Sequence, residues 1–353
     1  MDSPEAPPTR KRNIKKWLVP AVGYTIAIAS LYGVFHDFDY KLMEQDVRAL
    51  SWGWVLIGIL LNLTVYVLDG LRWAVLLSPA EDAPVAECVK AVFVGQVANA
   101  VLPAKAGEVV RCYLLSFWTD TPFTLALTAD AIGRVMDGLC MVIAFYLFTW
   151  SLVDMRRDLR DIAFIFAVVV VILSCLLLFV LFRREHAKLF VSNSKWGARF
   201  ASILHEIHSL GDAKVLLKAF GISVLYLLMP IFSVWALFHA YNFDFSFQQA
   251  AIVLVIIHMG TTLPGAPANV GAFQYAATIS LEMLAAGPME AKIFSVILYF
   301  AHTLPPIIVG AVVLLLTGIK LGEVHTHAKK AHSSGHPSSS PDQAPTVSST
   351  DGE

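Results

Sequence analysis

The chain has 353 residues, of which 57% are hydrophobic and 15% are charged, and its formal net charge is −1. Soluble domains carry about 25% charged residues, so this composition excludes an ordinary soluble fold. The near-zero net charge gives no information about partners. We therefore predict an all-α fold, a polytopic bundle of transmembrane helices.

Residues 1–16 are rich in Lys and Arg and precede the uncharged segment 17–35. A basic stretch before an apolar run also begins a signal peptide, but no convincing small-residue cleavage site follows here. We interpret 17–35 as a retained first span and 1–16 as a cytoplasmic N-terminus. The transmembrane domain is expected to cover residues 17–320.

Six apolar segments are long enough to cross a membrane, which takes about 20 residues. They are residues 17–35, 52–72, 122–150, 162–182, 219–243 and 293–319. The third of them is long enough although it carries Asp130, Arg134 and Asp137.

Two further apolar segments are interrupted, which gives eight hydrophobic segments in all. Residues 91–104 form an apolar arm of only 14 residues, and residues 245–281 form a run of 37 residues that is broken near its middle by Pro and Gly. Broken backbone is tolerated in a membrane only where it packs in protein or lines a wet cavity. We predict helical hairpins over 91–118 and 245–286, re-entrant rather than fully spanning, with the spanning arrangement as the alternative.

The distribution of basic residues favours the re-entrant arrangement. If every segment crossed the membrane, the basic loop 183–214 would lie outside, against the positive-inside rule. With two re-entrant hairpins, this loop and the C-terminus become cytoplasmic. Each half, about 17–152 and 162–319, then reads span, span, hairpin, span, with opposite orientations. This is an inverted repeat, the plan of many alternating-access carriers.

The loop 183–214 contains apolar residues at helical spacing beside its basic residues. It is expected to form either an interfacial helix on anionic lipid headgroups or a simple connecting helix. Residues 321–353 are rich in Ser, Pro, Gly and His and are expected to be disordered. We expect no metal role for these histidines.

Three acid–arginine pairs stand three residues apart, which places both members on one helix face. Asp69 and Arg72 lie near a span end and are expected to form a structural pair. The pairs Glu108 with Arg111 and Arg134 with Asp137 are expected to take part in binding the substrate. Arginine can donate two parallel hydrogen bonds to a phosphate, and Lys105 is a further phosphate candidate.

The second break carries polar residues without charge, and His258 and His302 lie in apolar runs as either packing residues or proton relays. Each break leaves backbone amides without helical partners, and such amides at a helix N-terminus attract anions. We therefore include residues of both breaks in the predicted site. The predicted substrate-binding residues are Asn99, Pro103, Lys105, Gly107, Glu108, Arg111, Arg134, Asp137, Pro264, Gly265, Asn269, Gly271, Gln274 and His302.

No catalytic motif is present: the sequence has no Gly-rich phosphate loop, no HExxH and no Gly-x-Ser-x-Gly. The four cysteines have no CxxC spacing and are expected to be reduced or lipid-buried. We predict no cofactor, no metal site, no catalytic residue and no nucleic-acid partner.

The chain resembles the transmembrane region of the lysylphosphatidylglycerol synthase/flippase family over roughly residues 14–320. Four motifs in order carry this resemblance: Leu71-Arg72-Trp73; Asn99, Pro103, Gly107, Glu108 and Arg111; Arg134 and Asp137; and Pro264-Gly265 followed by Gly271 and Phe273. The resemblance implies transfer of a lipid between leaflets. The resemblance does not extend to the soluble aminoacyl-transferase domain of bifunctional members. We therefore expect that the chain does not synthesise the lipid.

The sequence departs from that family at three charged positions. Gly133 and Gln274 stand where the family often has Glu, and Phe300 stands where Arg is common. Fewer acids make a cationic lysyl-lipid a less convincing substrate.

The leading hypothesis is a multi-pass flippase in the plasma or inner membrane, which moves a phosphate-bearing phospholipid or a polyprenyl-linked lipid. The first alternative is a non-catalytic accessory subunit of envelope-lipid or glycolipid synthesis, which predicts a lipid-synthesis enzyme as partner. The second alternative is a membrane-embedded lipid-modifying enzyme.

Overall fold

A computed structural model describes residues 25, 27–102, 105–149, 164, 168–169, 171–172, 210, 212–262 and 266–317. All of them belong to one compact unit, Met1–Thr317. The predicted basic N-terminus, most of the predicted span 162–182, most of the loop 183–214 and the predicted tail 321–353 lie outside the described residues.

Four long helices correspond to four of the predicted spans. They are α3 (Trp52–Leu77), α6 (Phe123–Thr149), α10 (Ala213–Ala240) and α13 (Pro288–Thr317). At 1.5 Å per residue each is roughly 39–45 Å long, which exceeds the roughly 30 Å hydrocarbon core. All four are apolar enough along their length to cross a membrane. The helical bundle predicted from composition is confirmed.

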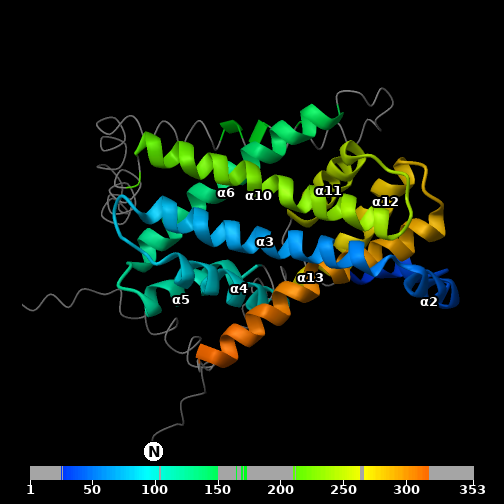
Figure 1. Cartoon of the computed structure of the whole chain (residues 1–353), viewed down its shortest axis with the longest axis horizontal. Coiled ribbons are helices and arrows are strands. Elements are labelled where there is room, and N and C mark those ends of the chain that lie inside the picture. The colour runs from blue at the N-terminus through cyan, green and yellow to red at the C-terminus, as the bar shows by residue number, and fades with distance from the viewer. Residues whose placement is uncertain are drawn as a thin grey trace, which may run out of the picture. The chain divides into compact units, whose positions relative to one another are not determined.

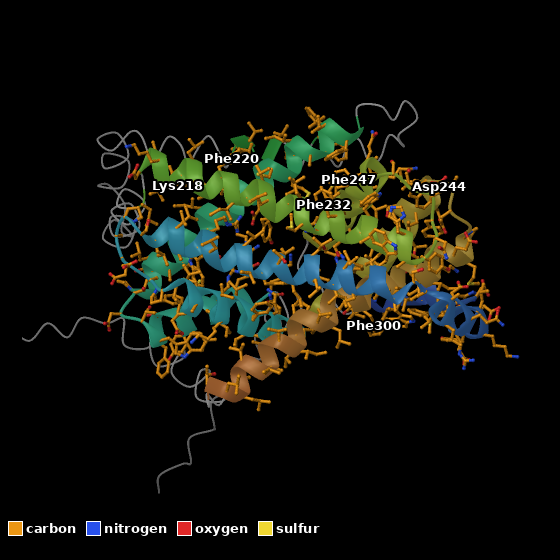
Figure 2. The ribbon with its side chains drawn as sticks, in the orientation of Figure 1. Lys218, Phe220, Phe232, Asp244, Phe247 and Phe300 are labelled. Carbon is orange, nitrogen blue, oxygen red and sulfur yellow. The ribbon has the colours of Figure 1, made fainter. Side chains whose placement is uncertain are left out.

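Large apolar side chains cover the outside of these helices. Leu217 of α10 is 73% exposed, and Leu315 and Leu316 of α13 are 81% and 82% exposed. Figure 2 labels Phe232 on α10 and Phe300 on α13, both of which are also exposed. Apolar exposure on this scale would be an aggregation hazard in water, whereas acyl chains of a bilayer solvate it.

The first interrupted segment forms a helical hairpin. Helix α4 (Val85–Val101) and helix α5 (Gly107–Trp118) pack against each other across the break. The side chain of Asn99 accepts a hydrogen bond of 2.8 Å from the Gly107 amide. A Cβ atom at Gly107 would lie 2.1 Å from the Gly95 carbonyl oxygen, so the two helices cross where only glycine fits.

The second interrupted segment also forms a hairpin. Helix α11 (Phe247–Thr262) is followed by a 3₁₀ turn, η1 (Pro267–Asn269), and by helix α12 (Ala272–Met283). Gly271 adopts φ 86° just before α12, and its amide donates to Gln274 Oε1 over 2.7 Å. The helices of both hairpins are roughly 18–26 Å long, shorter than a hydrocarbon core, which supports the re-entrant interpretation.

The two halves repeat each other in packing as well as in order. Exchanging α3 with α10, α4 with α11, α5 with α12 and α6 with α13 maps the contact of α4 with α13 onto that of α11 with α6. The same exchange maps the contact of α3 with α13 onto that of α10 with α6. Figure 1 shows α3 and α10 side by side through the bundle.

The equivalent helices α3 and α10 run antiparallel. The Ser51 amide donates to the Ala240 carbonyl at one end, over 3.0 Å, and Arg72 donates to Ser223 Oγ toward the other end, over 2.9 Å. Equivalent helices in opposite directions are what an inverted repeat requires. The first hairpin follows the Leu77 end of α3 and the second follows the Ala240 end of α10, so the hairpins enter from opposite ends.

A short helix, α2 (Tyr40–Ala49), precedes α3. Its first turn is capped by Asp39, whose side chain accepts from the amides of Lys41 and Leu42 over 2.9 and 3.0 Å. The Tyr241 hydroxyl donates to the Asp46 carboxylate. This bond ties α2 to the end of α10 and helps to fix the bundle at the end where the second hairpin begins.

Candidate functional site

A cavity of about 320 Å³ lies where the two hairpins meet the long helices. Each of the helices α3 to α6 and α10 to α13 contributes to its lining, as do both breaks. On the long helices the lining residues sit around mid-length: Tyr66 on α3, Asp137 on α6, Tyr226 on α10 and His302 on α13 are examples. If these helices cross a bilayer, the cavity lies near its midplane, where carriers bind their substrates.

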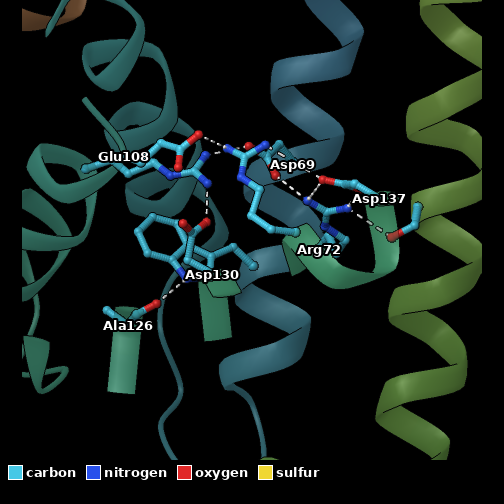
Figure 3. Close-up of polar contacts among 10 residues, drawn as sticks. Asp69, Arg72, Glu108, Ala126, Asp130 and Asp137 are labelled. Carbon is cyan, nitrogen blue, oxygen red and sulfur yellow. Dashed lines mark hydrogen bonds and ion pairs between the residues drawn. The ribbon is translucent and has the colours of Figure 1, made fainter. Parts of the chain in front are cut away.

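Beside the cavity lies a buried network of charged side chains, shown in Figure 3. Asp69 is its centre: Oδ1 accepts from Arg72 over 2.7 Å, and Oδ2 accepts from Arg111 over 2.6 Å. Arg72 also donates to Asp137, and Arg111 also donates to Asp130. Both arginine side chains are only 2% exposed.

Aromatic rings cover the two buried arginines. The guanidinium of Arg72 lies 4.9 Å from the centre of the Tyr226 ring, and that of Arg111 lies 5.5 Å from the centre of the Trp73 ring. Trp73 is itself fixed, because its Nε1–H donates to the Ala126 carbonyl over 3.0 Å. Such cation–π contacts stabilise a guanidinium where water is absent.

Arg134 is bound less tightly than the other two arginines. Its guanidinium lies 3.4 Å from Glu108 and 3.7 Å from Asp137. Tight charge-assisted hydrogen bonds are about 2.7–2.9 Å long. The side chain is 36% exposed and lines the cavity, and its buried Nε has no hydrogen-bond partner.

The pairs expected from helical spacing are present in two of three cases. Arg72 pairs with Asp69, and Arg134 approaches Asp137. Arg111 does not pair with Glu108: within the described residues its ion pairs go to Asp69 and Asp130. The reason is tertiary, since α5 presents Arg111 to acids on α3 and α6, which bind it more closely than its own helix neighbour.

This arrangement places Arg111 behind the cavity rather than in its lining. Arg111, which was predicted to bind the substrate, is therefore not among the residues that line this cavity. Lys105, for which a cytoplasmic position was the alternative, lines the cavity from the first break with φ 55°. Asn99, Glu108, Arg134 and Asp137, which were also predicted to bind the substrate, line it as well.

Of the predicted site residues in the second half, some line the cavity and others stabilise the start of α12. Asn269 and His302 line the cavity. Gly271 and Gln274 do not, because the Gln274 side chain turns back to the Gly271 amide at the start of α12. Gly107 likewise serves the helix crossing of the first hairpin. Pro103, Pro264 and Gly265 lie outside the described residues.

His302 is held between α3 and α10. Its Nε2 lies 2.9 Å from Ser233 Oγ, and Ser233 donates its own hydroxyl proton to the Gly58 carbonyl over 2.7 Å. The histidine nitrogen is therefore the donor in its contact with Ser233. Asn62 of α3 donates to the His302 carbonyl over 2.9 Å.

Several lining residues were not expected from the sequence. Asn62, Tyr66 and Tyr226 reach the cavity from helices that are apolar along most of their length. An Asn within a span was a signal for the first of them, because a polar residue in a membrane helix usually faces the bundle interior.

The charged residues of the site balance. Four carboxylates (Asp69, Glu108, Asp130 and Asp137) stand with four cations (Arg72, Lys105, Arg111 and Arg134). Within the first half, the network can therefore exchange partners without leaving a net buried charge, which would be costly in this environment.

A search of curated proteins finds no match to this chain. The model of one protein family, described as the lysylphosphatidylglycerol synthase TM region, matches residues 20–310. This range includes all of the charged network and both hairpins, and it reaches to within a few residues of the end of α13. The chain is therefore a membrane protein that belongs to the lysylphosphatidylglycerol synthase TM region family.

Proposed function

We propose that this protein moves a phosphate-bearing lipid between the two leaflets of a membrane without changing the lipid covalently. Its family and its membrane-length helices support a role among membrane lipids. The inverted pair of halves supports transport, because two such halves around a shared site can expose it to each side in turn.

One observation carries the proposal: Arg134 lines a cavity at the mid-length of the long helices and is only loosely paired. A lipid phosphate that leaves the headgroup region needs a positive partner inside the bilayer. The planar guanidinium of Arg134 can donate two bonds to phosphate oxygens. Lys105 supplies a second positive charge at the same cavity.

The acids around Arg134 provide for release. When the phosphate leaves, Glu108 and Asp137 are close enough to neutralise the guanidinium again. Binding and release then exchange one anion for another at Arg134. A site with a fully unpaired arginine would instead retain the phosphate, because no competing anion would displace it.

Reconstitution of the purified full chain in vesicles tests the proposal. Transfer of a tail-labelled phospholipid between leaflets is expected for the wild type and is expected to fall at least tenfold in Arg134→Gln. The matched control is Arg48→Gln on α2, whose arginine is 78% exposed and is expected to leave transfer unchanged. Wild-type transfer rates in a folded Arg134→Gln protein would contradict the assignment.

The absence of covalent chemistry is part of the proposal. Mass spectrometry of lipid recovered after transfer is expected to show the mass with which the lipid was supplied. A changed mass would favour the lipid-modifying enzyme. If the purified chain moves no lipid but isolates from membranes with a lipid-synthesis enzyme, the accessory-subunit hypothesis would be favoured.

We further propose a plasma or inner membrane location with both termini in the cytoplasm, and contact of the basic loop 183–214 with anionic lipid headgroups. The positive-inside rule supports this orientation. Proteolysis of intact cells from outside is expected to leave both termini uncut, and removal of either terminus by external protease would contradict it.

A further inference from the structure

The two halves of the chain contribute different chemistry to the shared cavity. Among the described residues, the charged residues that line it come from the first half: Asp69, Lys105, Glu108, Arg134 and Asp137. Among the described residues of α10 to α13 and their break, those that line the cavity include no Asp, Glu, Lys or Arg. The cavity therefore has a charged wall and a neutral wall.

The neutral wall carries both polar and apolar side chains. Thr261, Asn269, His302 and Thr303 line it, beside Phe273 and aliphatic residues such as Ile257 and Ile307. The Asn269 amide can donate and accept hydrogen bonds, whereas the Thr261 hydroxyl donates its proton to the Ile257 carbonyl over 2.8 Å and offers the ligand only its lone pairs. A neutral imidazole has one donor and one acceptor nitrogen. In a neutral His302 ring, Nε2–H is bonded to Ser233, which makes Nδ1 an acceptor. This set of groups matches ligand hydroxyls, which also donate and accept.

The charged wall offers little to a cationic headgroup. Each of the four network carboxylates already lies within 4 Å of an arginine: Asp69, Asp130 and Asp137 by direct bonds, and Glu108 at 3.4 Å from Arg134. An ammonium group would have to displace an arginine to reach a carboxylate, or stay unpaired in a buried site, and both cost free energy.

From this asymmetry we infer the substrate class, on the basis of the proposed lipid transfer. The lipid carries one phosphate, held by Arg134, and beyond it a small uncharged headgroup rich in hydroxyl groups, held by the neutral wall. A cationic aminoacyl headgroup is disfavoured. The cavity of about 320 Å³ lies at the small end of the roughly 300–1,000 Å³ range of ligand pockets, which favours a small headgroup.

Two kinds of lipid have this headgroup chemistry, a polyol phospholipid and a polyprenyl-phosphate monosaccharide. The test reconstitutes the full chain in vesicles and measures leaflet transfer of four tail-labelled lipids. The first two are phosphatidylglycerol and a polyprenyl-phosphate monosaccharide. The others are phosphatidic acid, which has no headgroup beyond phosphate, and lysyl-phosphatidylglycerol, which is aminoacylated. At least one of the two hydroxylated lipids is expected to move about tenfold faster than the other two.

Two variants test the neutral wall itself. Asn269→Gly removes the amide but keeps a residue that accepts the φ of 54° found there. Thr303→Val removes a hydroxyl at nearly constant shape. Each is expected to lower the preference for the hydroxylated lipid over phosphatidic acid by roughly three- to tenfold, the effect of one lost hydrogen bond. The matched control is Thr64→Val on the exposed face of α3, which is expected to keep the preference.

The outcomes separate this inference from the proposal on which it rests. Equal or faster transfer of lysyl-phosphatidylglycerol, or equal transfer of phosphatidic acid, would overturn the substrate class while leaving lipid transfer intact. An unchanged preference in both neutral-wall variants would overturn the role of that wall. Transfer of none of the four lipids above the rate of empty vesicles would overturn the proposed function and the inference with it.

Discussion

Arg111 Nη1 donates to Asp69 Oδ2 over 2.6 Å, and this bond joins α5 of the first hairpin to the long helix α3. Arg72 donates to the other oxygen of the same carboxylate over 2.7 Å. The Asp69 carboxylate thus binds two arginines, one from α3 and one from α5. Because all three side chains are buried, each charge relies on the others for neutralisation. This relationship gives Arg111 a structural task that differs from that of Arg134 at the cavity.

Arg111→Gln is expected to destabilise the protein by about 3–5 kcal/mol, because it leaves Asp130 without its bonded arginine and Asp69 with one arginine instead of two in a buried site. Denaturation in detergent, followed by circular dichroism, measures this change. The control Arg48→Gln disrupts only an exposed pair with Glu44 and is expected to cost less than about 1 kcal/mol. A stable Arg111→Gln protein that has lost lipid transfer would show that Arg111 instead contacts the substrate.

Glu108→Gln is expected to strengthen lipid binding while slowing transfer. The carboxylate of Glu108 competes with phosphate for Arg134, so its removal favours the bound state and delays release. Titration with a labelled lipid and leaflet transfer at saturating lipid measure the two effects separately. Glu87→Gln, which disrupts the pair with Lys90 on α4, is the matched control. Weaker binding in Glu108→Gln would indicate that this carboxylate binds the substrate directly.

Much of the fold follows from one-dimensional properties of the sequence. Segment length and hydrophobicity predict the four long helices, and Pro and Gly predict both breaks, because these residues act locally on the backbone. The inverted repeat follows from counting segments and basic loops. Each of these features depends on residues close together in the chain.

The partners within the site depend on the tertiary structure. Spacing of three residues correctly joins Asp69 with Arg72, but for Arg111 it cannot compare Glu108 with acids on α3 and α6. The cavity-facing side of α10 is not predictable in this way either, because a helix that is apolar on almost every face has no polar face that marks its orientation. Tyr226 is therefore identified as a lining residue only in the packed structure, whereas Asn62 of α3 had a signal in the sequence.

Gly107→Ala is expected to disrupt the first hairpin. Its Cβ would lie 2.1 Å from the Gly95 carbonyl oxygen and 2.5 Å from Asn99 Oδ1, so α4 and α5 must separate, at a cost of at least about 1–3 kcal/mol. Gly221→Ala in α10 is the control, since nothing lies within 4 Å of its added Cβ. Thermal unfolding of both variants in detergent gives the comparison, and equal midpoints would contradict the tight crossing.

Single-cysteine labelling is expected to place the two hairpins on opposite sides of the membrane. Asp82 and Asp120 flank the first hairpin, Asp244 and Glu282 flank the second, and all four are exposed. Lys90 near the start of α4 lies 5.8 Å from the Trp118 ring at the end of α5, so both ends of this hairpin are together. In a chain whose native cysteines are replaced, Asp82→Cys and Asp120→Cys are expected to react from one side only.

The reciprocal result is expected for Asp244→Cys and Glu282→Cys, which should react only from the other side, because α3 and α10 run antiparallel and each leads into its own hairpin. An impermeant maleimide, applied to sealed vesicles before and after permeabilisation, distinguishes the two sides. If Asp82→Cys and Asp120→Cys react from different sides, the first hairpin crosses the membrane fully. The two halves would then lose their opposite orientation, and the shared cavity could no longer open to each side by exchange of equivalent hairpins.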